Sequence, residues 1–259
     1  MGTASATDLI LVIDVGNSGA KLGVVRGEDV AGPVRLPRCD GPAVREFAKP
    51  LVRDQKPLVV VCGSDSAKAK DLAWELGKAG FPGALVVSHD HPGLPRAAAS
   101  QPEQAGVDRR VQALAAATLA AGPAIVVSAG TALTVDLASK EGALLGGSIG
   151  VGLGLAARAL TVGAEKLPLV DLKGVVPLPA LDTESAIRSG VVLGAAGAVE
   201  RLIEGMNAPA GAVVFLTGAD APLLSPHLRV PHRTHVGIGL LGVALAVRRA
   251  PPSPGSGIG

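Results

Sequence analysis

Three short segments of the chain carry side chains that could bind a phosphate group and transfer it. The first follows an apolar run and has the residues Asp14, Val15, Gly16, Asn17, Ser18, Gly19, Ala20 and Lys21. Its glycines allow backbone N–H groups to converge on an anion, Lys21 adds positive charge, and Asp14 could hold Mg²⁺ through water. An ordinary hairpin turn rich in Asn and Gly is the alternative, because the chain has no Walker-type G-x-x-x-x-G-K-[ST] motif.

A second turn, further along the chain, offers similar chemistry. It reads Ser128-Ala129-Gly130-Thr131 and stands between two apolar runs. Thr131 offers a hydroxyl group, and Gly130 lets the backbone approach a ligand closely. The turn therefore predicts a second phosphate contact, although a small-residue turn selected only for packing would look the same.

The third segment, Gly106-Val107-Asp108-Arg109, precedes an apolar stretch with helical spacing. Asp108 could act as a general base, and Arg109 could hold an anionic substrate. Because an Asp just before a helix is a favourable N-cap, these four residues alone favour the N-cap interpretation.

These segments must be positioned by strands that alternate with helices. Apolar runs predict strands at residues 9–13, 21–25, 58–62, 84–88, 124–128, 132–137 and 212–216. Helical spacing predicts helices at 44–53, 66–79, 108–121, 183–204 and 236–248. Each glycine-bearing turn joins two strands, so the sheets of this α/β fold should be mixed rather than purely parallel. The repeated hairpin predicts two related lobes with a ligand between them, unless the likeness is chance.

The composition excludes several classes of protein. Hydrophobic residues make up 48% of the chain and charged residues 18%, which rules out an intrinsically disordered protein. Aromatic residues are only 2% and the net charge is +2, so nucleic acid is not an expected partner. Cys39 and Cys62 cannot build a disulfide scaffold, and a cytoplasmic location is expected. The uncharged stretch 111–135 is broken by Gly122-Pro123, so no membrane association is expected.

These segments, with others later in the chain, resemble the motifs of the type III pantothenate kinases, members of the actin-like ATPase superfamily. The match runs from Leu9 to about Val247 in the family's order. Each motif is short, but several in register are specific. The matching segments are Asp14–Ser18 (first phosphate motif), Gly106–Arg109 (G-x-D-R), Gly130–Asp136 (G-T-A strand), Gly146–Ile149, Thr183–Ile187 (T-x-x-A-I) and Thr217–Ala219 (T-G-G-like turn).

The resemblance implies a fold of two actin-like ATPase (ribonuclease H-like) lobes, with mixed sheets flanked by helices and ATP in the cleft. Residues 1–121 would form the N-terminal lobe, with the first phosphate motif and the G-x-D-R motif. Residues 122–249 would form the C-terminal lobe, with the second phosphate motif and a dimer helix, and 250–259 a flexible tail. The implied activity is ATP-dependent phosphorylation of pantothenate to 4′-phosphopantothenate, the first step of coenzyme A biosynthesis.

The resemblance also implies a role for each matching residue. Asp14 through Lys21 and Thr131 would contact ATP, with Asp14 nearest to Mg²⁺. Asp108 would take the proton from the primary hydroxyl of pantothenate. Gly106, Val107, Asp108 and Arg109 would border pantothenate, and Thr183 would reach it from a neighbouring subunit, which implies a homodimer. Phosphoryl transfer needs mainly positioning and charge neutralisation.

The sequence departs from the family pattern in three places. The family usually has Asp at the position of Ser128, where it binds an activating K⁺ or NH₄⁺, and a neutral Ser supplies no anionic oxygen. A Tyr that the family often places near the position of Ala99 is missing, as is a proline within 147–152. The sequence thus predicts a kinase with altered requirements, and leaves a catalytically degenerate nucleotide-binding or regulatory paralogue as the alternative.

Overall fold

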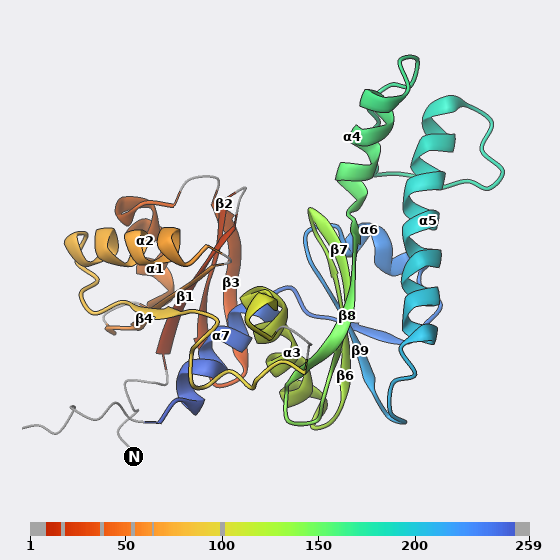
Figure 1. Cartoon of the computed structure of the whole chain (residues 1–259). Helices are drawn as coiled ribbons and strands as arrows, with labels where there is room; N and C mark the ends of the chain where they lie inside the picture. Colours follow the sequence, from red (N-terminus) through yellow and green to blue (C-terminus); the bar gives the residue numbers. More distant parts are fainter. Residues whose placement is uncertain are drawn as a thin grey trace, which may run out of the picture. The chain divides into compact units, whose positions relative to one another are not determined.

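The computed structural model describes residues 9–16, 19–36, 39–52, 55–63, 65–98 and 102–251 of the 259-residue chain. The chain divides into two compact units (Figure 1). The first contains residues 1–115, 142–144 and 237–259, and the second contains 116–141 and 145–236. Within the described residues, no helix is both long enough and apolar enough to cross a bilayer.

The first unit contains a five-stranded sheet with the order β3-β2-β1-β4-β5. Its strands are β1 (Leu9–Gly16), β2 (Gly19–Arg26), β3 (Asp29–Leu36), β4 (Leu58–Gly63) and β5 (Leu85–Val87). β1, β2 and β3 pair antiparallel, whereas β1, β4 and β5 pair parallel. The carboxyl ends of these three parallel strands therefore share one edge of the sheet.

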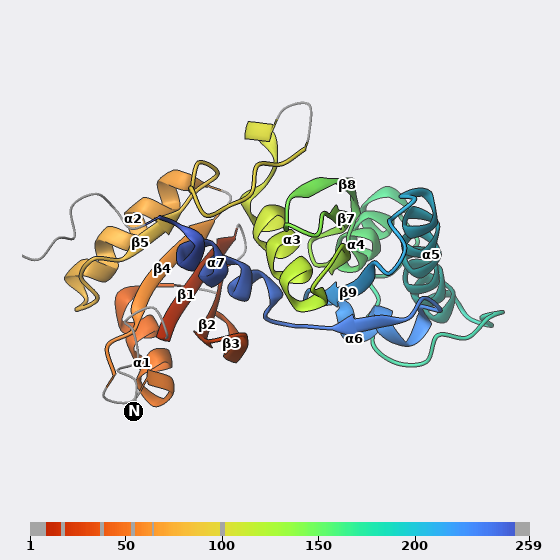
Figure 2. The same cartoon turned by 90° about the horizontal axis from the view of Figure 1, so that it is seen from below.

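Four helices accompany this sheet: α1 (Gly41–Val52), α2 (Ser66–Lys78), α3 (Val107–Ala120) and α7 (Ile238–Arg249). Side chains alternate along β1, so Leu9, Leu11 and Ile13 join the core formed with α1 and α2. α7 packs against β1 and its neighbours, and Figure 2 shows it beside β1 and β4. α3 packs on α7 so closely that a Cβ at Gly242 would overlap the backbone of Val111.

The second unit repeats the strand order of the first. Its sheet has the order β10-β9-β6-β7-β8. The strands are β6 (Ala124–Ala129), β7 (Ala132–Ala138), β8 (Leu144–Val151), β9 (Val213–Thr217) and β10 (His232–Thr234). β6 pairs antiparallel with β7 and parallel with β9, as β1 does with β2 and β4. The mixed sheets and the two strand–turn–strand units predicted from the sequence are thus confirmed.

Helices α4 (Leu153–Gly163), α5 (Thr183–Gly205) and α6 (Ala221–Leu224) complete the second unit, and short 3-10 turns lie at Pro102–Gln104 and Ser225–His227. One face of the sheet packs its apolar side chains against α5 and α6. α4 and α5 lie side by side and pack on each other beyond the sheet (Figure 1). The helix predicted at 183–204 is confirmed as α5.

The fold differs from the sequence expectations in its elements and in its division. β3, β8, β10, α4 and α6 were not predicted. β3 and β8 were missed because their exposed residues give no continuous apolar run. The expected lobe boundary near residue 121 also differs from the observed division. The chain enters the second unit within α3, and α7 returns to the first unit, where its apolar side chains are buried against β1 and β2.

Candidate functional site

Asp14 lies near the carboxyl end of β1, where the burial of the strand decreases toward the hairpin tip. Its partner across the antiparallel pair is Lys21 on β2, and its partner across the parallel pair is Cys62 on β4. Burial raises the pKa of Asp14 to about 6; the Lys21 ammonium opposes this shift, and the Asp108 carboxylate adds to it. Asp14 is therefore a partly desolvated carboxylate that a cation would stabilise.

Asp108 lies in the first turn of α3, which begins at Val107. The N-cap position of this helix falls on Gly106, so the N-cap interpretation of Asp108 does not fit the observed helix start. Gly106 is also closely packed: a Cβ there would come within 2.5 Å of Oδ1 of Asp108. Asp108 is exposed, Val107 is buried and Arg109 is half-buried, so the carboxylate is free to meet a ligand.

Two carboxylates that are far apart in the sequence are brought together in the first unit. Burial is the main cause of the raised pKa of Asp14, and the charge of Asp108 adds a smaller repulsion. Burial also raises the pKa of the Cys62 thiol, with smaller contributions from the charges of Asp14 and Asp108. The Asp108 carboxylate, in the first turn of α3, therefore lies near enough to the carboxyl end of β1 for its charge to act on both groups.

The hairpin between β1 and β2 has the tight geometry that its glycines predict. Gly16 pairs with Gly19, and Gly19 has a φ of 120°, a left-handed conformation that favours glycine. Val15 and Ala20 are paired neighbours in the two strands, and Lys21 is exposed. The predicted phosphate contacts at Asn17 and Ser18 lie outside the described residues.

In the second unit, three of the predicted motifs meet at the carboxyl end of β6. The Gly152 N–H donates to the carbonyl oxygen of Thr131 at 3.1 Å, and a Cβ at Gly152 would overlap the backbone of the turn. Gly218, with a φ of 99°, lies equally close to Ala129. Glycine backbones from two sides thus enclose the turn, and the Thr131 side chain remains exposed.

Ser128 is half-buried near the end of β6, directly before this turn. Its cross-strand partners are Thr134 on β7 and Thr217 on β9, so three hydroxyl side chains stand in a row across the sheet. A row of hydroxyl groups supplies neutral oxygen atoms and no negative charge.

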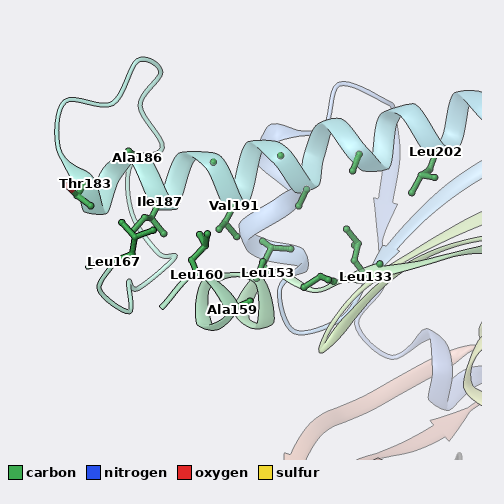
Figure 3. Close-up of a pocket in the computed structure, with 17 residues that line it drawn as sticks. Leu133, Leu153, Ala159, Leu160, Leu167, Thr183, Ala186, Ile187, Val191 and Leu202 are labelled. Carbon is green, nitrogen blue, oxygen red and sulfur yellow. The ribbon is translucent and has the colours of Figure 1, made fainter. Parts of the chain in front are cut away.

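Thr183 is the first residue of α5 and is exposed. Asp182 caps this helix, because its Oδ1 accepts a hydrogen bond from the Ser185 N–H at 2.9 Å. Thr183 also lines an apolar groove between α4 and α5 (Figure 3). The predicted substrate residue Thr183 therefore belongs to the second unit, whereas Gly106 through Arg109 belong to the first.

Metal-binding groups are sparse in the described part of the chain: no cluster there gathers three or more His, Cys, Asp or Glu side chains. His89 Nε2 lies 3.0 Å from Asp90 Oδ1 at the surface. Magnesium in kinase sites is commonly held by one or two carboxylates and by the phosphates of the substrate. Asp14 fits that pattern, because it is a desolvated carboxylate beside a strand end.

Two sheets of equal strand order, each flanked by helices, define the actin-like ATPase class of fold. Solved structures agree: a Baf family transcriptional activator from Campylobacter jejuni gives a TM-score of 0.58 at 18% identity, covering 92% of this chain and 97% of that one. Component A of (R)-2-hydroxyglutaryl-CoA dehydratase from Acidaminococcus fermentans gives a TM-score of 0.53 at 17% identity, covering 93% and 97%. At these identities the likeness concerns the fold alone.

The family follows from the sequence comparisons. The sequence pattern of the type III pantothenate kinase family matches residues 10–205. A type III pantothenate kinase of Parafrankia sp. is 32% identical over 247 residues, covering 90% of this chain and 97% of that protein. The corresponding protein of Porphyromonas gingivalis is 32% identical over 238 residues, covering 90% and 95%. The chain belongs to the type III pantothenate kinase family, a family of phosphotransferases, which confirms the resemblance.

Proposed function

We propose that this protein transfers the γ-phosphoryl group of ATP to the primary hydroxyl of pantothenate, giving ADP and 4′-phosphopantothenate, the first intermediate of coenzyme A biosynthesis. The observation that carries this proposal is that Asp108, in the first turn of α3, lies near enough to Asp14, at the carboxyl end of β1, for their charges to interact. One carboxylate suits the metal–nucleotide and the other suits the acceptor, as phosphoryl transfer to an alcohol requires.

In this proposal Asp108 accepts the proton of the pantothenate hydroxyl while that oxygen attacks the γ-phosphorus. The P–O bond to ADP breaks as the new bond forms. Arg109, half-buried beside Asp108, pairs with the carboxylate of pantothenate. Gly106 and Val107 are proposed to border the acceptor, since they directly precede Asp108 at the start of α3.

ATP is proposed to bind along the β1–β2 hairpin, from Asp14 to Lys21, with a further contact from Thr131. Asp14 would hold Mg²⁺ through water, since the attraction of a cation offsets the desolvation penalty that raises the pKa of this carboxylate. Mg²⁺, when bound, neutralises charge on the phosphate oxygens. Lys21 supplies a fixed positive charge on the neighbouring strand.

The monovalent cation of the family is proposed to be dispensable here. Ser128 and its neighbours Thr134 and Thr217 offer hydroxyl oxygens, and a cation held only by neutral oxygens is bound weakly compared with one held by a carboxylate. Activity should therefore depend only weakly on K⁺ or NH₄⁺.

A coupled assay of ADP release with pantothenate tests the proposed activity. We expect turnover that requires both substrates, and Asp108→Asn should abolish it while ATP binding, measured by calorimetry, persists. An active Asp108→Asn enzyme would remove the base role from Asp108. Binding of ATP without turnover, under any monovalent cation, would identify the degenerate nucleotide-binding paralogue instead.

We also propose that the protein is a cytoplasmic homodimer that pairs through the second unit. The groove between α4 and α5 has a volume of about 870 Å³ and an almost wholly apolar lining. Figure 3 shows Leu153, Leu160, Ile187 and Val191 pointing into it. Leu153, Ile187 and Val191 are buried at the floor of the groove, whereas Val151 and Leu160 of its lining are exposed, and exposed apolar side chains that gather in one place commonly mark a protein interface. A second subunit that packs on this groove would place its own Thr183, which lies at the rim of its groove, close to the first subunit.

Gly194 provides a clean test of this pairing. It lies on the groove side of α5, and a Cβ there meets no atom within 4 Å in the single chain. Gly194→Glu should therefore leave the protomer folded but introduce a charge into the interface. Gly197→Glu is the matched control, since Gly197 is equally open but does not line the groove. We expect light scattering to show dimers for the wild type and Gly197→Glu, and monomers for Gly194→Glu; a monomeric wild type would refute the pairing.

A further inference from the structure

Arg110 is a charged side chain held almost entirely inside the first unit, with 6% of its surface exposed. Its Nη1 donates to the carbonyl oxygen of His89 at 2.5 Å. Its Nη2 donates to the carbonyl oxygens of Leu94 at 3.4 Å and Pro95 at 3.0 Å. A buried guanidinium is costly unless its donors are paired. Nε of Arg110 is buried without a hydrogen-bond partner in the described part of the chain, so the bonds of Nη1 and Nη2 are what hold the arginine to this segment.

The segment that Arg110 binds begins where the site lies. β5 pairs parallel with β4, which pairs parallel with β1, so residues 88–95 leave the sheet at the edge that carries Asp14. Ligands of open α/β sheets bind outside the carboxyl ends of parallel strands. Further along, a Cβ at Gly93 would overlap the carbonyl oxygen of Ala246 on α7, so this segment is also closely packed on its far side.

The other end of this connection is the first turn of α3. Arg110 follows Asp108 by two residues and Arg109 by one. Val111 lies against Gly242, so α7 fixes how closely α3 approaches. The contact between Val111 and Gly242 does not fix the first turn of α3, which must be held by residues at the edge of the sheet. Arg110 supplies this hold through three backbone carbonyls, which no change of side chain in residues 88–95 would remove.

We propose that Arg110 is a positioning residue: it ties the first turn of α3 to the segment leaving β5, and so sets Asp108 and Arg109 against the edge that carries Asp14. Arg110 itself touches no reacting atom. The catalytic effect of this positioning rests on the proposed function. The hydrogen bonds between Arg110 on α3 and residues 88–95 are independent of that function.

Arg110→Met and Arg110→Lys test the proposal. Met keeps an unbranched apolar stem and removes all donors, whereas Lys keeps a charge that can reach one or two of the three carbonyls. We expect Arg110→Met to lower kcat about tenfold or more, with the KM for ATP changed by about twofold at most, because misplacement by about an ångström weakens transition-state contacts. Arg110→Lys should fall between Arg110→Met and the wild type.

Arg248→Met is the matched control. The Arg248 Nη1 donates to the carbonyl oxygen of Gly27 at 2.6 Å, in the β2–β3 turn at the other end of β2 from the β1–β2 hairpin. The Arg248→Met substitution should lower the melting temperature about as much as Arg110→Met does, but it should leave kcat unchanged. Wild-type kcat in Arg110→Met, or an equal loss of kcat in Arg248→Met, would overturn the proposal.

Hydrogen exchange without substrates separates this inference from the proposed function. In Arg110→Met, the hydrogen-bonded backbone amides of His91, Gly93 and Leu94 and the amide at position 110 in the first turn of α3 should exchange faster than in the wild type, while those of α2 stay unchanged. Unchanged protection in both segments would overturn the positioning role. A wild-type protein that fails to phosphorylate pantothenate would refute the proposed function and leave this result standing.

Discussion

The end of β1 and the end of β6 occupy the same place in two equivalent sheets but carry different chemistry. Asp14 is the fifth residue of β1 in register with β4, and Ser128 is the fifth residue of β6 in register with β9. Their parallel-strand neighbours are Cys62 and Thr217. The first unit thus presents a carboxylate at this position, and the second presents a hydroxyl group.

The equivalence continues into the turns that follow the neighbouring strands. These read Cys62-Gly63-Ser64-Asp65 and Thr217-Gly218-Ala219-Asp220. A Cβ at Gly63 would lie 2.8 Å from the carbonyl oxygen of Val15, and one at Gly218 would overlap that of Ala129. Val15 and Ala129 are themselves equivalent, since each follows the Asp14 or Ser128 position. Both units therefore build the strand end with the same glycine contact.

The two aspartates of these turns serve different partners. Asp65 caps α2, with Oδ1 accepting from the Ala67 N–H at 3.0 Å and the Lys68 N–H at 3.2 Å. Asp220 has its pKa raised by burial, and this shift is opposed by a hydrogen bond from the Gly154 N–H and by the Arg158 charge. The comparison shows that the two units share one backbone arrangement at this strand end, while the aspartates of the following turns have different partners. It also shows that the negatively charged Asp14, proposed above to hold a metal, stands where the second unit has Ser128.

The largest effect should come from removing that charge. Asp14→Asn keeps the shape of the side chain and should lower kcat/KM by about 10³-fold, or about 4 kcal/mol, because a group that stabilises transition-state charge is lost. Ser128→Ala, at the equivalent place, should change it by about threefold at most, since a neutral hydroxyl contributes little. The ADP-release assay compares the two. Equal losses would mean that the two strand ends share one task.

Replacing the glycine of the shared contact should lower the free energy of unfolding more in the second unit than in the first. Gly218→Ala combines a left-handed φ with an overlap against Ala129, and should destabilise the protein by about 3 kcal/mol. Gly63→Ala meets only the 2.8 Å contact and should cost about 1–2 kcal/mol. Denaturant unfolding measures both. Gly197→Ala, where a Cβ meets nothing within 4 Å, should be neutral or stabilising and serves as the control.

Much of this fold was predictable because the signals are local. Leu9–Ile13 and 124–128 are buried apolar runs followed by glycine turns, and both proved to be central strands. β3 was missed because its mostly exposed residues show no apolar pattern. α7 was predicted as a helix, but its assignment to the first sheet depends on packing between segments far apart in the sequence, which no local pattern encodes.

The site was predictable in part for the same reason. Asp14 and Asp108 carry motif signals, and the structure brings them together. Arg110 was not singled out in the sequence, because its hydrogen bonds go to backbone carbonyl oxygens of residues 89–95 that carry no sequence signature. The second copy of the turn, Thr217–Asp220 against Cys62–Asp65, was visible as a C-G-x-D and T-G-x-D likeness, and its equal place after the two parallel strands could have revealed it.

The charge at Asp14 should also make stability depend on pH. The folded-state pKa of about 6 lies above the usual value of 3.8 for an aspartate, so between these values the folded protein keeps a proton that the unfolded chain has lost. Stability should therefore fall by about 2–3 kcal/mol as pH rises through this range, and level off above it. Asp14→Asn should remove this component and melt higher than the wild type at pH 8, with the difference shrinking toward pH 4. A gap that grows on acidification would contradict the assignment.

The smallest expected effect concerns Ser128, the residue of the second unit that occupies the place of Asp14. When KCl replaces NaCl at constant ionic strength, the wild-type rate should change by about threefold at most, because hydroxyl oxygens alone bind a monovalent cation weakly. Ser128→Asp places a carboxylate where the first unit has Asp14, between Thr134 and Thr217, and should create a clear preference for K⁺.

A steep K⁺ dependence in the wild type would mean that another group replaces the missing carboxylate. The buried Asp136 is the first candidate, because side chains alternate along β7 and it shares a sheet face with Thr134. Asp136→Asn would then have to abolish the K⁺ response that Ser128→Ala leaves intact.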